Sequence, residues 1–199
     1  MDFMIIRKLF KYEMSHRVLG AFTKRCSENV HGHSYKLEML FEGVQPDAAQ
    51  MVMDFGLVKK YFHPFVDSFD HAHCLWNIDS QVADHEMAYI KEWNQRWISL
   101  PFSSTAEMQA KMFYTFGSRA LSELRVQKLI PDRTTMHAVR VHETDTGYAE
   151  YNKDHADYNW DNTPSCQFPR VHLKDIEFSL QIQDEWPVEF QEFYAKLAV

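Results

Sequence analysis

The chain has 199 residues, of which 45% are hydrophobic and 15% aromatic, and its formal net charge is −7. This length favours one domain with a sizeable core, and the negative charge argues against non-specific nucleic-acid binding, which needs a basic surface. No apolar run approaches the ~20 residues that span a bilayer, and the N-terminus does not resemble a signal peptide. Three scattered cysteines fit a reducing compartment, so we expect a cytoplasmic enzyme.

The first two predicted strands cover residues 3–16 and 33–43 and are expected to pair antiparallel. Side chains two apart on a strand share a face, so His31 and His33 point to the apolar side, and His16 has the parity of the apolar residues before it. A buried imidazole needs partners for both ring nitrogens, and three converging ones are best satisfied by a metal. Three protein ligands plus an open position are typical of a catalytic zinc site. The alternative is three separately hydrogen-bonded histidines.

The middle of the chain predicts helices. Asp54 is the expected N-cap of a helix that Pro64 kinks or divides, and its inward residues are Phe55, Val58, Phe62, Phe65 and Phe69. Residues 80–97 suggest an amphipathic helix that buries Met87, Ile90, Trp93 and Trp97. A stronger helix starts at Ser104, where Ser104–Glu107 match a capping box. Its core-facing stripe consists of Met108, Met112, Phe116, Ala120 and Leu124.

Strands return in the last third of the chain. A strand at 135–144 is expected to place His137, Val139, Val141 and Glu143 on one face, with Tyr148–Tyr151 as its hairpin partner. The polar segment 152–170 predicts a loop. A late strand carries Ile176, Phe178, Leu180 and Ile182, and residues 187–197 form a closing helix. This order predicts an α+β fold with helices gathered on one face of an antiparallel sheet.

Three further features carry possible chemistry. Cys26 follows two cations, which favour the reactive thiolate form; the alternative is an unreactive loop cysteine. In the pair Asp70–His71, the carboxylate can fix the imidazole tautomer and raise its basicity. Glu143 lies on an otherwise apolar strand face, where a carboxylate is costly unless it accepts hydrogen bonds from a partner or ligand, although it could instead lie at the solvent boundary.

Taken together, these residues resemble the 6-pyruvoyl-tetrahydropterin synthase and 6-carboxy-tetrahydropterin synthase family. The similarity covers roughly residues 5–151, and beyond Tyr151 no counterpart is recognised. We therefore expect a synthase-like domain over 1–151 and a C-terminal extension of it over 152–199. The matching motifs, in family order, are Tyr12–His16, Cys26, His31–His33, Met53–Gly56, Asp70–His71, Thr105–Glu107 and His142–Thr144.

The resemblance implies the tunnelling fold, in which two-helix, four-strand units assemble into closed β-barrels, here most simply a homohexamer of two trimers with sites between subunits. It implies zinc on His16, His31 and His33. It makes Cys26 the proton-abstracting thiol and Asp70 and His71 its relay. It also implies that Glu143 anchors the amino-pyrimidine edge of a pterin, with Thr105 and Glu107 on the same substrate.

The implied substrate is 7,8-dihydroneopterin triphosphate. We favour the carboxy branch, which yields 6-carboxy-5,6,7,8-tetrahydropterin with release of triphosphate and acetaldehyde in queuosine synthesis; the pyruvoyl branch, which eliminates triphosphate only, is the alternative. A non-catalytic pterin- or metal-binding paralogue would have no need of the thiol. A zinc hydrolase would need a carboxylate base, and the sequence has no His-Glu-x-x-His helix to supply one.

Overall fold

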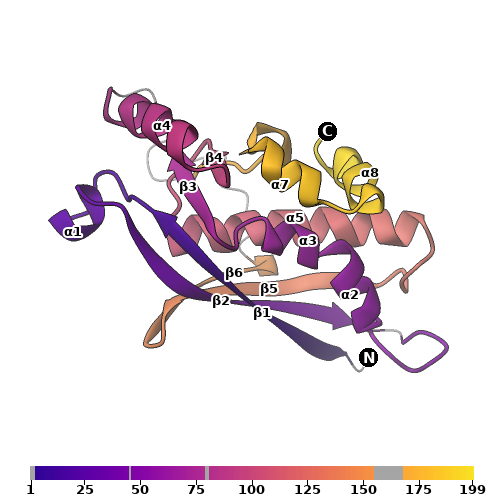
Figure 1. Cartoon of the computed structure of the whole chain (residues 1–199). Helices are drawn as coiled ribbons and strands as arrows, with labels where there is room; N and C mark the ends of the chain where they lie inside the picture. Colours follow the sequence, from indigo (N-terminus) through magenta and orange to yellow (C-terminus); the bar gives the residue numbers. More distant parts are fainter. Residues whose placement is uncertain (1–2, 45, 79–80, 155–167) are drawn as a thin grey trace.

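A seven-stranded sheet in the order β6-β5-β2-β1-β3-β4-β7 carries helices packed along one side of its long strands (Figure 1). The computed structural model describes residues 3–44, 46–78, 81–154 and 168–199. Its elements are β1 (Met4–His16), α1 (Lys24–Ser27), β2 (His31–Gly43), α2 (Phe55–Tyr61), α3 (His63–Asp67), β3 (Ala72–Trp76), α4 (Gln81–Trp93), β4 (Trp97–Leu100), α5 (Ala106–Val126), β5 (Thr134–Thr144), β6 (Gly147–Asn152), a 3-10 turn (Leu173–Asp175), β7 (Glu177–Phe178), α7 (Leu180–Glu185) and α8 (Val188–Leu197).

The predicted antiparallel pair β1–β2 is confirmed. It runs in register from Met4 opposite Gly43 to His16 opposite His31. The side chains that alternate inward are buried, among them Tyr12 and Tyr35, whose rings stack with centroids 5.0 Å apart. Alternation over thirteen residues therefore brings His16 and His31 together at one end of the sheet.

Strand β5 and its hairpin with β6 also form as predicted, but the face assigned to His137 is wrong. Leu40 pairs with Ala138 and Phe41 with Met136, so the β2–β5 register shifts by one residue at this point. A bulge of this kind leaves one residue unpaired and reverses the alternation beyond it. As a result Met136 is buried with Val139, whereas His137 turns away and bonds Glu42.

The sheet is not antiparallel throughout. β3 runs parallel to β1, and β4 runs parallel to β3, with α4 as the connection between them. A helical crossover of this length lets successive strands run in the same direction. The expected helix at 80–97 therefore ends at Trp93, which is exposed, and Trp97 begins a strand.

The helix starts are close to those expected. Asp54 accepts a hydrogen bond from the Gly56 amide at 2.7 Å and caps α2, and the chain divides at Phe62 into α2 and α3. Phe55, expected inside, is exposed because it lies on the outer side of the first turn. The expected cap of α5 is shifted by one residue: Thr105, not Ser104, accepts the bond from the Met108 amide.

The late strand is wrong beyond Phe178. β7 contains two residues, which pair with β4, and Leu180 begins the helix α7 with its side chain exposed while Ile182 is buried. The closing helix is confirmed as α8. Most of the expected loop at 152–170 lies outside the described residues. None of the described helices combines the length and apolar character needed to span a membrane.

Candidate active site

The three histidines of the first two strands lie together at the end of the sheet. Their ring centroids are 4.6 Å (His16 to His31), 5.4 Å (His16 to His33) and 5.1 Å (His31 to His33) apart. One nitrogen from each ring lies within 4.8 Å of those of the other two. His16 is fully buried, and the other two are partly exposed. The predicted convergence of the rings is therefore present in a single chain.

Hydrogen bonds hold two of these rings through Nδ1 and leave Nε2 available. His16 Nδ1 lies 3.1 Å from the Ser104 carbonyl oxygen, and His31 Nδ1 lies 3.0 Å from the Asn29 carbonyl oxygen. A carbonyl accepts only from a protonated nitrogen, so each contact fixes a tautomer whose Nε2 carries the lone pair. Metal-binding histidines are commonly held by such a contact through the other nitrogen. The donor set therefore fits zinc, because three imidazole nitrogens are one of its catalytic ligand sets.

The pKa of His16 is lowered to about 4, chiefly by burial; the hydrogen bond to Ser104 opposes the shift, and the neighbouring His31 and His33 contribute to it. His16 is thus neutral at physiological pH. The unfolded chain, with an ordinary pKa of 6.5, binds more protons at this site than the folded chain between about pH 6.5 and 4.

The metal-free protein should therefore lose stability as the pH falls through that window, by up to about 3 kcal/mol from this group. Urea unfolding in the presence of a chelator at pH 7.5 and 4.5 measures the loss. The His16→Asn variant, which cannot titrate here, should show a smaller pH dependence than the wild type. Equal pH dependence in both proteins would contradict the assignment.

Glu143 lies beside the histidine cluster. Its Oε1 atom accepts a hydrogen bond from Tyr35 at 3.2 Å and lies 3.5 Å from His16 Nε2 and 3.7 Å from His33 Nε2. Glu143 falls at an irregularity in the β5–β6 pairing, between His142 and Thr144. Such irregularities re-aim side chains next to active sites. Glu143 lies on the inner face as expected, at the solvent boundary, with about a third of its side chain exposed.

A buried polar network that the sequence analysis did not identify supports this site. Tyr12 donates to Gln109 Oε1 at 2.6 Å, and Gln109 Nε2 donates to the same Ser104 carbonyl that holds His16. Burial raises the pKa of Tyr35, and the Glu143 carboxylate raises it further, so its phenol stays a donor. The available sequence signal was Gln109 itself, a buried polar residue on the apolar face of α5.

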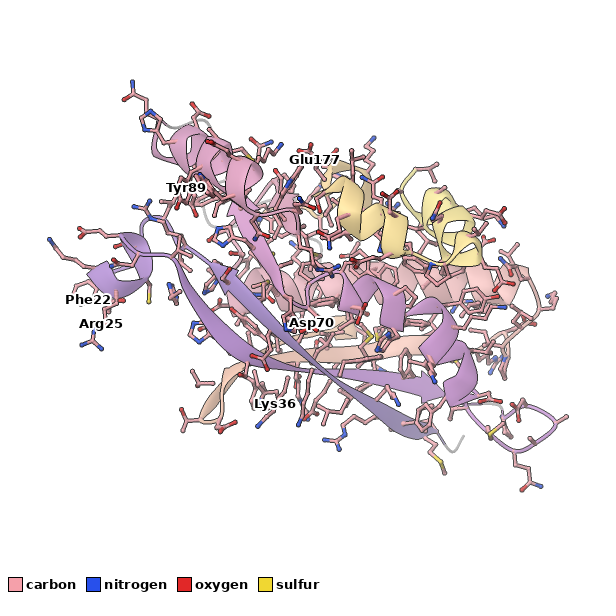
Figure 2. All side chains as sticks on the ribbon, in the orientation of Figure 1. Phe22, Arg25, Lys36, Asp70, Tyr89 and Glu177 are labelled. Atoms are coloured by element: carbon pink, nitrogen blue, oxygen red, sulfur yellow. The ribbon has the colours of Figure 1, made fainter. Side chains whose placement is uncertain are left out.

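Cys26 is half-buried on α1, in the loop that joins His16 to His31. Its carbonyl oxygen accepts from the Val18 amide at 2.9 Å, and Arg17 donates to the Ser27 carbonyl at 2.8 Å, so the loop is tied to the end of β1. The two cations before it are directed elsewhere: Lys24 pairs with Glu28, and Arg25 points away from the sheet (Figure 2).

Asp70 and His71 form the expected pair in the turn before β3. Asp70 Oδ2 lies 2.8 Å from His71 Nδ1, while Oδ1 accepts from the Glu13 amide at 2.7 Å. His71 is 76% exposed, and neither residue makes a hydrogen bond or ion pair with the histidine cluster of its own chain. Within the described residues of one chain, the Asp70–His71 pair therefore has no direct polar contact with the cluster.

The remaining expected residues lie at the start of α5. Thr105 follows Ser104 and caps the helix, which keeps its backbone next to the residue that holds His16. Glu107 is exposed in the first turn, where a carboxylate complements the helix dipole. Cys74 is buried, and burial raises the pKa of its thiol well above the ordinary value. Cys166 lies outside the described residues.

The family model described as 6-pyruvoyl tetrahydropterin synthase matches residues 5–154. Two curated relatives carry the name 6-carboxy-5,6,7,8-tetrahydropterin synthase. The protein of Helicobacter pylori strain J99 is 34% identical over 184 residues, 92% of this chain and 86% of its own length. The protein of Aquifex aeolicus is 31% identical over 163 residues, 75% of this chain and 98% of its own. The Helicobacter match necessarily extends past Tyr151, so the C-terminal segment does have a counterpart.

Two solved structures are similar in fold. An uncharacterized protein of Wolinella succinogenes superposes with a TM-score of 0.58 at 17% identity and covers 77% of this chain and 99% of its own. The 6-pyruvoyl tetrahydropterin synthase of Plasmodium falciparum gives a TM-score of 0.54 at 16% identity, with 76% and 98% covered. At these identities the likeness bears on the fold alone.

Proposed function

This chain belongs to the 6-pyruvoyl tetrahydropterin synthase family and has its tunnelling fold, and we propose that it is a zinc-dependent lyase of the carboxy branch. The proposed reaction converts 7,8-dihydroneopterin triphosphate into 6-carboxy-5,6,7,8-tetrahydropterin, with release of triphosphate and acetaldehyde, for queuosine synthesis in the cytoplasm. The convergence of His16, His31 and His33 beside Glu143 is the observation that carries the proposal. The name shared by the curated relatives supports the branch.

The cluster would hold zinc through the three histidines, and the bound ion would polarise the side-chain hydroxyls of the substrate. Glu143 offers a planar carboxylate that can accept two parallel hydrogen bonds from an amino-pyrimidine edge. The Tyr35 phenol donates to this carboxylate and keeps it oriented. Thr105 and Glu107 are proposed to lie along the same substrate.

Proton movement is assigned to Cys26, Asp70 and His71. Cys26 is assigned as the group that takes a proton from the substrate side chain. His71 receives and returns protons, while the Asp70 carboxylate fixes its tautomer. Because His71 is exposed and separate from the cluster of its own chain, we propose that residues from two subunits complete each site.

Incubation of the purified protein with 7,8-dihydroneopterin triphosphate tests the reaction. Mass analysis of the pterin and an acetaldehyde assay should give one acetaldehyde for each triphosphate released. Triphosphate without acetaldehyde, and a pterin that keeps all its carbons, would assign the protein to the pyruvoyl branch. If protein that holds zinc forms neither product, the chain is instead a non-catalytic pterin- or metal-binding protein.

The assembly is expected to be a homohexamer of two trimers. The last strands of the described sheet are β7, which has two residues, at one end and β6 at the other. An unpaired strand edge favours pairing with another chain, and cyclic symmetry closes such contacts into a barrel. We propose that residues 1–151 form this assembling domain and that 152–199 extend it. Sedimentation at micromolar concentration measures the state; a fully active monomer would contradict it.

A further inference from the structure

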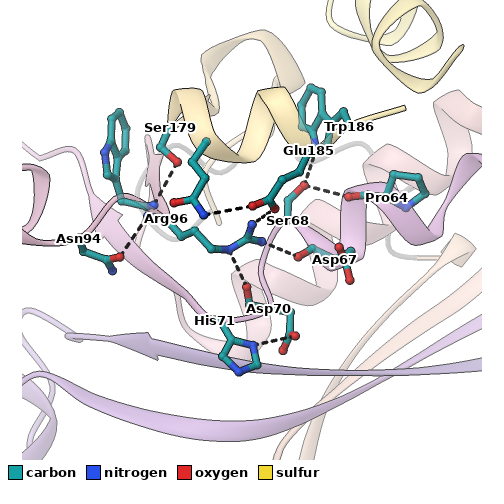
Figure 3. A network of polar contacts seen from close by, with 12 residues as sticks. Pro64, Asp67, Ser68, Asp70, His71, Asn94, Arg96, Ser179, Glu185 and Trp186 are labelled. Carbon is teal, nitrogen blue, oxygen red and sulfur yellow. Dashed lines mark hydrogen bonds and ion pairs between the residues drawn. The ribbon is translucent and has the colours of Figure 1, made fainter. Parts of the chain in front are cut away.

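Arg96 links its own segment to two parts of the fold that lie far from it in sequence, residues 67–71 and the C-terminal extension. It lies between α4 and β4, and its side chain is 15% exposed. Its Nε atom donates to the Asp70 carbonyl oxygen at 3.1 Å, and Nη2 donates to the Asp67 carbonyl oxygen at 3.0 Å. Its Nη1 atom pairs with the Glu185 carboxylate of α7 (Figure 3). One guanidinium thus binds the end of α3, the Asp70–His71 turn and the C-terminal extension.

The turn that Arg96 binds needs support. His71 has a φ of 55°, in the left-handed region that residues with a side chain rarely adopt. Such a conformation persists where surrounding contacts hold it. On one side, the His71 amide donates to the Glu13 carbonyl and Asp70 Oδ1 accepts from the Glu13 amide, each at 2.7 Å. On the other side, the hydrogen bond from Arg96 to the Asp70 carbonyl oxygen holds the turn.

The C-terminal extension reaches the same turn through a second contact. Trp186 donates from Nε1 to Ser68 Oγ at 2.8 Å, and Glu185 precedes it at the end of α7 (Figure 3). Arg96, Glu185 and Trp186 border a small cavity of about 180 Å³ against α3. The extension therefore contacts Ser68, two residues before Asp70, directly and the Asp70 carbonyl through Arg96.

We propose that Arg96, held by Glu185, is a positioning residue for the Asp70–His71 relay, and that this contact is how the C-terminal extension serves catalysis. The inference rests on the proposed function, since it takes Asp70 and His71 as the relay. Arg96 donates to two carbonyls and one carboxylate from three different nitrogens of a rigid plane, whereas the three N–H donors of an ammonium share one nitrogen and cannot keep that spacing. A displacement of about 1 Å in a proton-transfer group is enough to lower turnover strongly.

The test compares kcat, KM and zinc content of the intact protein carrying Arg96→Gln, Arg96→Lys or Glu185→Gln. Arg96→Gln should lower kcat by about 10- to 100-fold with KM and zinc content unchanged, and the other two variants should lower it less. The matched control is Lys60→Gln, which breaks an ion pair of 2.8 Å between α2 and Glu189 of α8 without touching the turn. Wild-type kcat in Arg96→Gln and Glu185→Gln would overturn the inference.

A double-mutant cycle separates positioning from a merely structural role. Asparagine tolerates the left-handed region, so His71→Asn removes the imidazole and keeps the turn. If Arg96 acts through His71, adding Arg96→Gln to His71→Asn should cause no further loss of kcat. If the loss of kcat in the double variant equals the product of the two single losses, the inference is overturned, while the assignment of His71 to the relay stands. Wild-type kcat in His71→Asn would instead overturn the relay, and the inference with it.

Discussion

Replacing Cys26 with alanine should lower turnover by about 10²- to 10⁴-fold, the usual contribution of a group that transfers a proton in the transition state. The side chain is half-buried on α1 and makes no contact on which the histidine cluster depends, because the loop is held by the backbone atoms of Cys26 and Ser27. Zinc content and the unfolding transition should therefore stay at wild-type values. Steady-state kinetics on zinc-quantified protein measures the effect.

The matched control is Cys74→Ala. Cys74 is fully buried on β3, beside His16, and burial raises the pKa of its thiol, so it is protonated at neutral pH. This substitution should cost about 1 kcal/mol of stability and leave turnover per folded molecule unchanged. Wild-type activity in Cys26→Ala together with an inactive Cys74→Ala would mean that the reactive thiol is Cys74.

The histidine cluster could be predicted because its geometry is local. Strict alternation on β1 and β2 determines which side chains share a face, and the pairing of His16 with His31 follows once the two strands form a hairpin. The same rule failed at His137, where a single unpaired residue in the β2–β5 register turned the side chain to the other face. Nothing in the spacing of β5 signals that bulge.

The strands β3 and β4 were missed for a different reason. Their residues are mostly buried on both faces, so no alternation is visible, and short apolar runs of this kind cannot be told from helix by period. The contacts of Ser104 with His16 and of Glu185 with Arg96 join residues 88 and 89 positions apart. Such contacts depend on how elements pack, which local patterns do not encode.

Replacing His33 with alanine should remove zinc and with it turnover. His33 is one of only three imidazoles in the cluster, and the other two alone do not provide the three protein ligands of a catalytic zinc site. Metal analysis of carefully purified protein should give one zinc for each wild-type chain and almost none for the variant. Turnover should fall at least as far as in Cys26→Ala, because the ion polarises the reacting hydroxyls.

His137→Ala is the matched control for this substitution. Both histidines lie on the long strands of the sheet, and their side chains are similarly exposed, 24% for His33 and 29% for His137. His137 bonds Glu42, which keeps Lys153 as a second partner, so the control loses one hydrogen bond and should bind zinc as the wild type does. Unchanged zinc in His33→Ala, or almost none in the wild type, would mean that the three rings are separately hydrogen-bonded histidines. Loss of zinc in His33→Ala but not in His137→Ala would show that the metal binds at the cluster, because general destabilisation of the sheet would lower the zinc content of both variants.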